Sequence, residues 1–87
     1  MNKGTTATGF EFEISDDALD DYELLELLTE LDNGDYGRVT MVIEKLLGKE
    51  QKERLKEHIR KNGKVSAERM MNEVADIFAQ ANEKLKN

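Results

Sequence analysis

The chain has 87 residues and a formal net charge of −6, with 38% hydrophobic and 37% charged residues. This length accommodates one small domain with a thin core, so a partner or a second copy is a reasonable expectation. The absence of cysteine excludes a disulfide framework and a thiolate zinc site, and His58 is the only histidine. No apolar run approaches the roughly 20 residues that span a bilayer. The first residues lack the apolar core of a signal peptide, so we expect a cytoplasmic protein.

Charge is distributed unevenly along the chain. Residues 1–35 carry eleven acids and one base, a net charge of −10. Residues 36–64 carry nine bases and four acids, +5, and residues 65–87 carry three bases and four acids, −1. Copies of such a chain can pack head to tail, or its ends can dock on different partners. An ordinary helical domain with acids early and bases late is the alternative.

The N-terminal segment predicts a tail followed by a strand. Residues 1–9 combine Gly, Thr and Ala without periodicity, which is typical of a flexible tail. Residues 10–14 alternate apolar and acidic side chains, the pattern of a half-buried strand. A lone strand cannot satisfy its own backbone, so we expect this segment to lie over the helices or to pair with another chain. Phe10 and Phe12 are therefore candidate oligomer contacts.

The first predicted helix runs from about Asp16 to Asp32. Ser15 is suited to be its N-cap, and the two aspartates that follow suit the positive end of the helix dipole. Leucines recur at helical spacing through this segment. Gly34 can adopt the left-handed conformation that ends a helix.

Two glycines divide the remainder into three further helices. The predicted segments are residues 36–47, 49–62 and 66–85, separated by Gly48 and Gly63. The first has the clearest apolar stripe, the second is mostly charged, and Ser66 is the expected cap of the third. The predicted fold is all-α: a small bundle of about four helices over residues 10–87, with a flexible tail over residues 1–9 and a candidate short strand.

Catalytic and metal sites are not supported by the pattern. A calcium loop starting at Asp32 would place Gly34 and Ile43 at ligand positions, which removes essential oxygens. The many carboxylates are expected on a solvated helix face, where they stay ionised. No nucleophile set, phosphate loop or cofactor fingerprint is present. We therefore expect a non-enzymatic protein without metal or cofactor.

A nucleic-acid-binding site is the alternative. Residues 49–62 and 66–85 resemble the two halves of a helix-turn-helix, and the first is rich in bases. Acidic residues alternate with these bases, however, and the second helix carries acids that phosphates would repel. The other interpretation is an exposed helix with internal ion pairs.

A protein partner is favoured by the leucines of the first helix, which lie on more than one side. A domain this small is expected to leave some of them uncovered, and burying each is worth roughly 1.5–3 kcal/mol. A helix used entirely by its own core is the alternative. The predicted partner-binding face consists of Tyr22, Leu24, Leu27, Leu28 and Leu31.

Several short sequence segments resemble those of a known family. They are DDYELLELL at 20–28, LLGKEQ at 46–51, LKEHIR at 55–60, NGKVSAERM at 62–70 and VADIF at 74–78. Together they resemble the small tail assembly chaperones of siphophages and prophages of Gram-positive bacteria, from about Ile14 onward. The resemblance supplies no residue-level site.

The resemblance implies a binding function in the host bacterial cytoplasm. Such proteins bind the tape measure protein, a long apolar-rich helical chain, and keep it soluble until tail tube protein polymerises around it. The implied partners are the tape measure protein, further copies of this chain and, as a further candidate, tail tube protein, with no nucleic acid or membrane. A phage-encoded DNA-binding regulator and an acidic domain that only associates with itself are the alternatives.

Overall fold

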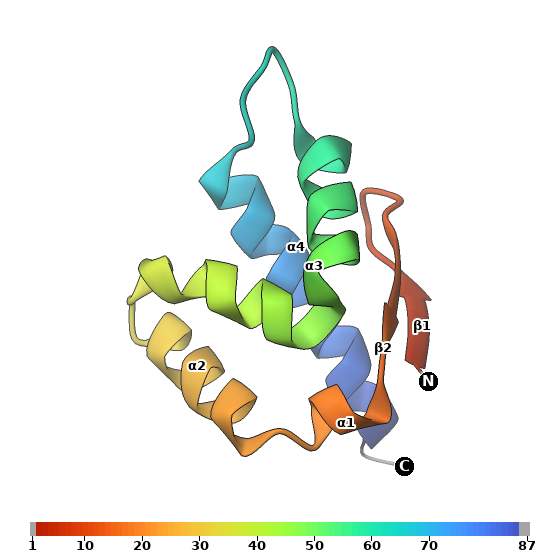
Figure 1. Ribbon diagram of the computed structural model, residues 1–87, viewed down its shortest axis with the longest axis vertical. Coiled ribbons are helices and arrows are strands. Elements are labelled where there is room, and N and C mark those ends of the chain that lie inside the picture. Colours follow the sequence, from red (N-terminus) through yellow and green to blue (C-terminus); the bar gives the residue numbers. More distant parts are fainter. Residues whose placement is uncertain (1, 86–87) are drawn as a thin grey trace.

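The computed structural model describes the backbone of residues 2–85 and the side chains of residues 3–81. The described chain is mostly helical, with four helices preceded by a short hairpin (Figure 1). This confirms the predicted fold class. The elements are β1 (Asn2–Thr5), β2 (Glu11–Ile14), α1 (Asp16–Leu19), α2 (Tyr22–Asp32), the 3₁₀ turn η1 (Tyr36–Arg38), α3 (Val39–Ile59) and α4 (Ala67–Leu85).

Strands β1 and β2 form an antiparallel hairpin in which Gly4 pairs with Phe12. The predicted alternation is confirmed, because Phe12 and Ile14 are buried while the two glutamates of β2 are exposed. The prediction of a flexible tail is wrong for the described residues 2–9. They form β1 and the hairpin turn, and the Thr6 side chain is only 4% exposed.

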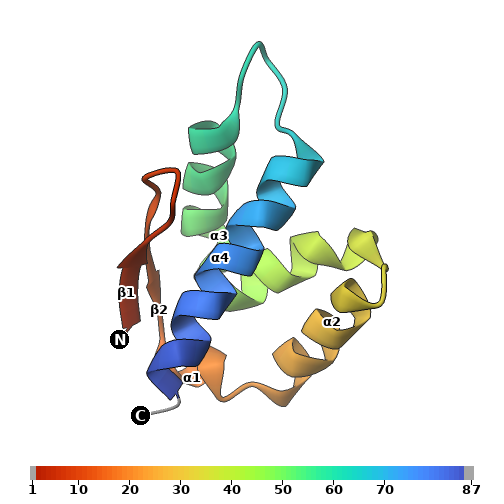
Figure 2. The same cartoon turned by 180° about the vertical axis from the view of Figure 1, so that it is seen from behind.

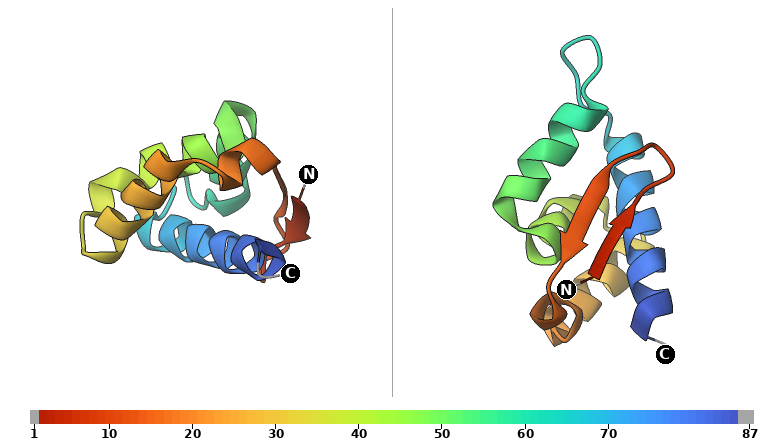
Figure 3. Two further views of the ribbon diagram at one scale, coloured as in Figure 1. Left: turned by 90° about the horizontal axis from the view of Figure 1, so that it is seen from below. Right: turned by 90° about the vertical axis from the view of Figure 1, so that its right-hand side faces the viewer.

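Two glutamine side chains bind the outer edges of the hairpin. The Gln51 amide, from α3, donates to the Glu13 carbonyl and accepts from the Glu13 N–H, both at 2.7 Å. The Gln80 amide, from α4, donates to the Thr5 carbonyl at 3.0 Å. A carboxamide offers the same donor and acceptor as a peptide group, so each glutamine replaces part of a missing neighbouring strand. The hairpin consequently lies across α3 and α4 (Figure 3).

The segment predicted as the first helix forms two helices, because the helical conformation is interrupted at Asp20 and Asp21. Ser15 caps α1 as predicted, through a bond from the Ala18 N–H. Asp21 has an extended backbone, and its carboxylate accepts from the first N–H groups of α2. Aspartate is more favourable at an N-cap than inside a helix, because its short side chain accepts hydrogen bonds from the backbone N–H groups that follow. A new helix therefore begins at Asp21.

Helix α3 bends sharply at Gly48, whose φ of 83° and ψ of 167° are not helical. The bend separates the two segments predicted as distinct helices, and Figure 2 shows the change of direction from behind. Residues Tyr36–Arg38, expected to be α-helical, form the 3₁₀ turn η1.

The connection from α3 to α4 begins with a tight turn at the far end of the molecule. Asn62 and Gly63 both have positive φ, 54° and 77°, as a type I′ turn requires. Lys61 and Lys64 flank them and exchange backbone hydrogen bonds of 2.9 and 3.1 Å. Ser66 then caps α4, as predicted, by accepting from the Arg69 N–H. We call residues 60–64 the basic tip.

One apolar core joins the hairpin to the four helices. The kink in α3 lets both of its halves contribute to this core. No helix in the described part of the chain is both long and apolar enough to cross a membrane. The buried apolar residues are Phe10, Phe12, Ile14, Leu24, Leu27, Val42, Ile43, Leu46, Leu47, Leu55, Ile59, Met70, Val74, Ile77 and Ala81.

Candidate partner-binding surface

The structure places most of the predicted partner-binding face inside the molecule. Leu24 and Leu27 are 2% and 7% exposed and belong to the core. Leu28 and Leu31 are half-buried and pack against the same core. Only Tyr22, at 71% exposure, projects largely into solvent. Leu24 and Leu27 are covered by their own chain, because α2 packs on α3 through this stripe, so only the exposed part of the predicted face is open to a partner.

The structure instead exposes apolar side chains that the periodicity did not select. Leu25 is 52% exposed and lies three residues after Tyr22, so the two share the outer side of α2. Leu25 is turned about 100° from Leu24, off the buried stripe. Tyr36 and Met41 are 59% and 45% exposed. We call Tyr22 and Leu25 together the α2 face.

Phe10 and Phe12, the predicted oligomer contacts, are each 4% exposed. The Phe10 ring lies 5.5 Å from the ring of His58 and beneath the Arg54 guanidinium at 5.3 Å. In this fold both phenylalanines pack within their own chain, and their contact with a second copy stays a prediction. The alternating pattern identified a buried strand face correctly but could not identify what covers it.

Carboxylates surround the α2 face, and two cations of the same chain pair with some of them. Lys45 lies 3.4 Å from Asp21 and 3.9 Å from Glu23, while Arg38 lies 3.0 Å from Glu30. Burial alone would raise the pKa of Asp21, but hydrogen bonds from the Leu24 N–H and the Lys45 ammonium outweigh it and hold this pKa below its usual value. The Asp21 carboxylate therefore stays ionised at neutral pH, and α2 presents its exposed apolar side chains beside acidic ones.

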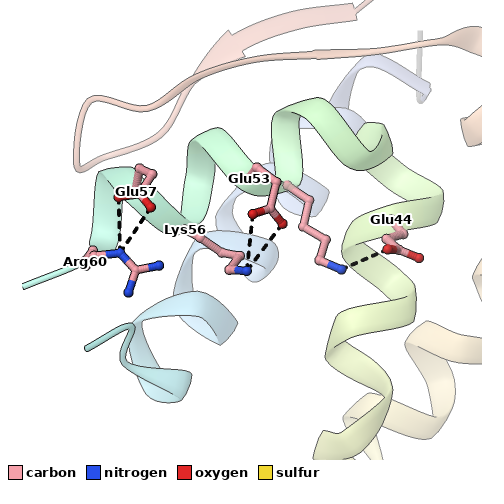
Figure 4. A network of polar contacts seen from close by, with 6 residues as sticks. Glu44, Glu53, Lys56, Glu57 and Arg60 are labelled. Carbon is pink, nitrogen blue, oxygen red and sulfur yellow. Dashed lines mark hydrogen bonds and ion pairs between the residues drawn. The ribbon is translucent and has the colours of Figure 1, made fainter. Parts of the chain in front are cut away.

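Some bases of α3, and Arg60 at its C-terminal end, pair with acids of the same helix, as Figure 4 shows. Lys56 lies 3.3 Å from Glu53, and Arg60 lies 3.1 Å from Glu57. These pairs leave less positive charge on α3 for a phosphate backbone than the count of bases suggests. The arrangement gives little support to the alternative of a DNA-binding helix.

A third ion pair joins the two halves of α3 across the kink. Lys52 lies 2.8 Å from Glu44, and its hydrogen bond and charge lower the pKa of Glu44. Eight residues separate the two partners, so the bend at Gly48 is what brings them together.

A buried polar cluster fixes the hairpin turn to α4. The Glu73 carboxylate, on a side chain 4% exposed, accepts from the hydroxyls of Thr6 at 3.0 Å and Thr8 at 2.6 Å. The Asp76 carboxylate accepts from the Ala7 N–H at 2.8 Å. Hydroxyl and amide donors satisfy both acids, so the cluster is a structural support for the hairpin.

The described residues bring together no group of three or more side chains suited to hold a metal ion. A groove runs between the hairpin and the kink of α3, and charged side chains of both signs line it, among them Lys3, Glu13 and Lys49. Its walls carry no nucleophile paired with a base.

Comparisons with family models, with curated proteins and with solved structures found no match to this chain. The fold and the surface therefore define its class: a small helical domain with an N-terminal hairpin and an exposed, acid-flanked apolar face on α2.

Proposed function

We propose that this protein is a non-enzymatic phage tail assembly chaperone of the host cytoplasm. It binds apolar helical segments of the tape measure protein and keeps that protein soluble until tail tube protein polymerises. The observation that carries the proposal is the α2 face, where Tyr22 and Leu25 are 71% and 52% exposed. The resemblance of residues 20–28, which contain this face, to tail assembly chaperones supplies the client.

The physical basis is the combination of exposed apolar area with acidic surroundings. Covering apolar surface stabilises a complex by roughly 25 cal/mol per Å². An amphipathic client helix can place its apolar side on Tyr22 and Leu25, as helices do in grooves of partner proteins. The carboxylates that flank the face then add net negative charge to the complex, which opposes aggregation.

Co-expression with a tape measure protein tests this proposal. We expect the wild-type chain to keep the client in the soluble fraction, and the Tyr22→Ser, Leu25→Ser double variant to lose most of that effect. Both side chains are largely exposed, so the variant should fold, which its circular dichroism would verify. Tyr36→Ser is the matched control, since it removes an exposed aromatic side chain from η1 instead of α2.

Two results would contradict the proposal. If the folded double variant protects the client as well as wild type does, the α2 face is not the binding surface. If wild type itself leaves the client insoluble, the chaperone function is wrong.

A further inference from the structure

Opposite charges lie at the two ends of the molecule. The longest dimension is 40 Å, against 26 and 20 Å for the others. Figures 1 and 2 show the basic tip at one end of this long axis and α1 with the start of α2 at the other. The basic tip, residues 60–64, holds three bases and no acid, a net charge of +3. Residues 16–26, which we call the acidic end, hold six acids and no base, a net charge of −6.

The basic tip is a well-defined projection. The type I′ turn and the two backbone hydrogen bonds between Lys61 and Lys64 hold its backbone. Both lysines are exposed, and within the described side chains neither ammonium group has a carboxylate partner. Arg60, by contrast, is paired with Glu57. The tip therefore offers two neighbouring lysines on a defined backbone turn.

The acidic end offers the complementary groups. Asp17 on α1, Asp20 after it and Glu26 on α2 are exposed, and no cationic side chain among the described residues pairs with them. Among the described side chains, Lys45 pairs with two other acids of this end, Asp21 and Glu23. This region thus keeps most of its negative charge.

We propose that these chains associate head to tail, with the basic tip of one copy docked on the acidic end of the next. The two surfaces lie on opposite ends of the molecule, so a contact between two like ends would place like charges together, whereas a contact between unlike ends pairs opposite charges. A head-to-tail contact leaves one tip and one acidic end unused and can repeat, which gives open chains. A second copy fits the tip better than nucleic acid does, because the net charge of −6 repels a polyanion. The contact does not depend on the chaperone function proposed above.

Sedimentation of the purified protein tests the contact through two separate variants. The tip variant carries Lys61→Gln and Lys64→Gln; the acidic-end variant carries Asp17→Asn, Asp20→Asn and Glu26→Gln. We expect the wild-type mass to rise with concentration at about 0.02 M salt, where the Debye length is roughly 20 Å, and to fall to that of the monomer at about 0.5 M. Each variant alone should stay monomeric.

Mixing the variants gives the decisive measurement. The tip variant keeps its acidic end and the acidic-end variant keeps its tip, so an equal mixture should form a one-to-one dimer and stop there. Lys49→Gln with Lys56→Gln is the control, because it changes the net charge by the same amount as the tip variant but outside residues 60–64, and it should associate like wild type. A monomeric wild type at low salt, a tip variant that associates normally, or a mixture that stays monomeric would overturn the proposal. Duplex DNA retained by wild type and lost by the tip variant would assign the tip to nucleic acid and overturn it as well.

Discussion

The carboxylate of Glu73 shows how one buried acid organises its neighbours. Thr8 donates its hydroxyl hydrogen to Glu73 at 2.6 Å, so it can only accept in its 3.0 Å contact with Nε2 of His58. The contact therefore requires the hydrogen of His58 on Nε2. The same ring packs against Phe10. His58, the single histidine of the chain, thus links the hairpin turn to α3.

Gly4 is required because the Phe12 ring crosses the hairpin directly beside it. A Cβ at this position would lie 2.6 Å from Cζ of Phe12 and 2.7 Å from Oε1 of Gln80. We expect Gly4→Ala to lower the free energy of unfolding by about 1–3 kcal/mol, because the buried ring must shift. Urea unfolding measures this. Gly37→Ala is the control, since its Cβ would meet only Asp35 at 3.7 Å, and equal midpoints for both variants would contradict the packing described.

The bend in α3 allows both halves of this helix to place apolar side chains in the core. The half before Gly48 contributes Val42 and Leu46, and the half after it contributes Leu55 and Ile59. A straight helix of this length would carry one of these pairs away from the hairpin. The backbone of Gly48 also lies in a region of φ and ψ that side chains with a Cβ rarely enter.

Replacing Gly48 by alanine isolates this conformational requirement. Its Cβ would meet nothing within 4 Å, so any loss comes from the backbone and not from a clash. We expect Gly48→Ala to lower the free energy of unfolding by about 1–3 kcal/mol. Amide hydrogen exchange should be faster in the second half of α3, near Leu55 and Ile59. A variant as stable as Gly37→Ala, with unchanged exchange, would show that the bend does not depend on glycine.

In the whole molecule, some structural features depend on residues that are neighbours in the sequence, and others depend on residues far apart in it. Ser15, Ser66 and Gly48 act on their immediate neighbours, so the helices could be predicted from spacing and caps. The hairpin turn could not, because Thr6 binds Glu73 at a separation of 67 residues. The outward position of Leu25 was missed for the same reason: which side of α2 is covered depends on where α3 packs.

Deleting residues 2–9 distinguishes a dispensable tail from a hairpin that the fold requires. The deletion removes β1 and both hydroxyl donors to Glu73, and it uncovers Phe12, so we expect a loss of at least about 2 kcal/mol in unfolding free energy. Thermal unfolding should occur at a lower temperature, and the truncated chain should bind a hydrophobic dye. The full-length variant Lys3→Ser with Ala7→Ser is the control, because it changes only exposed side chains and leaves β1 in place. If the truncated chain unfolds at the same temperature as wild type, residues 2–9 are a dispensable tail. The core would then have to be stable without β1.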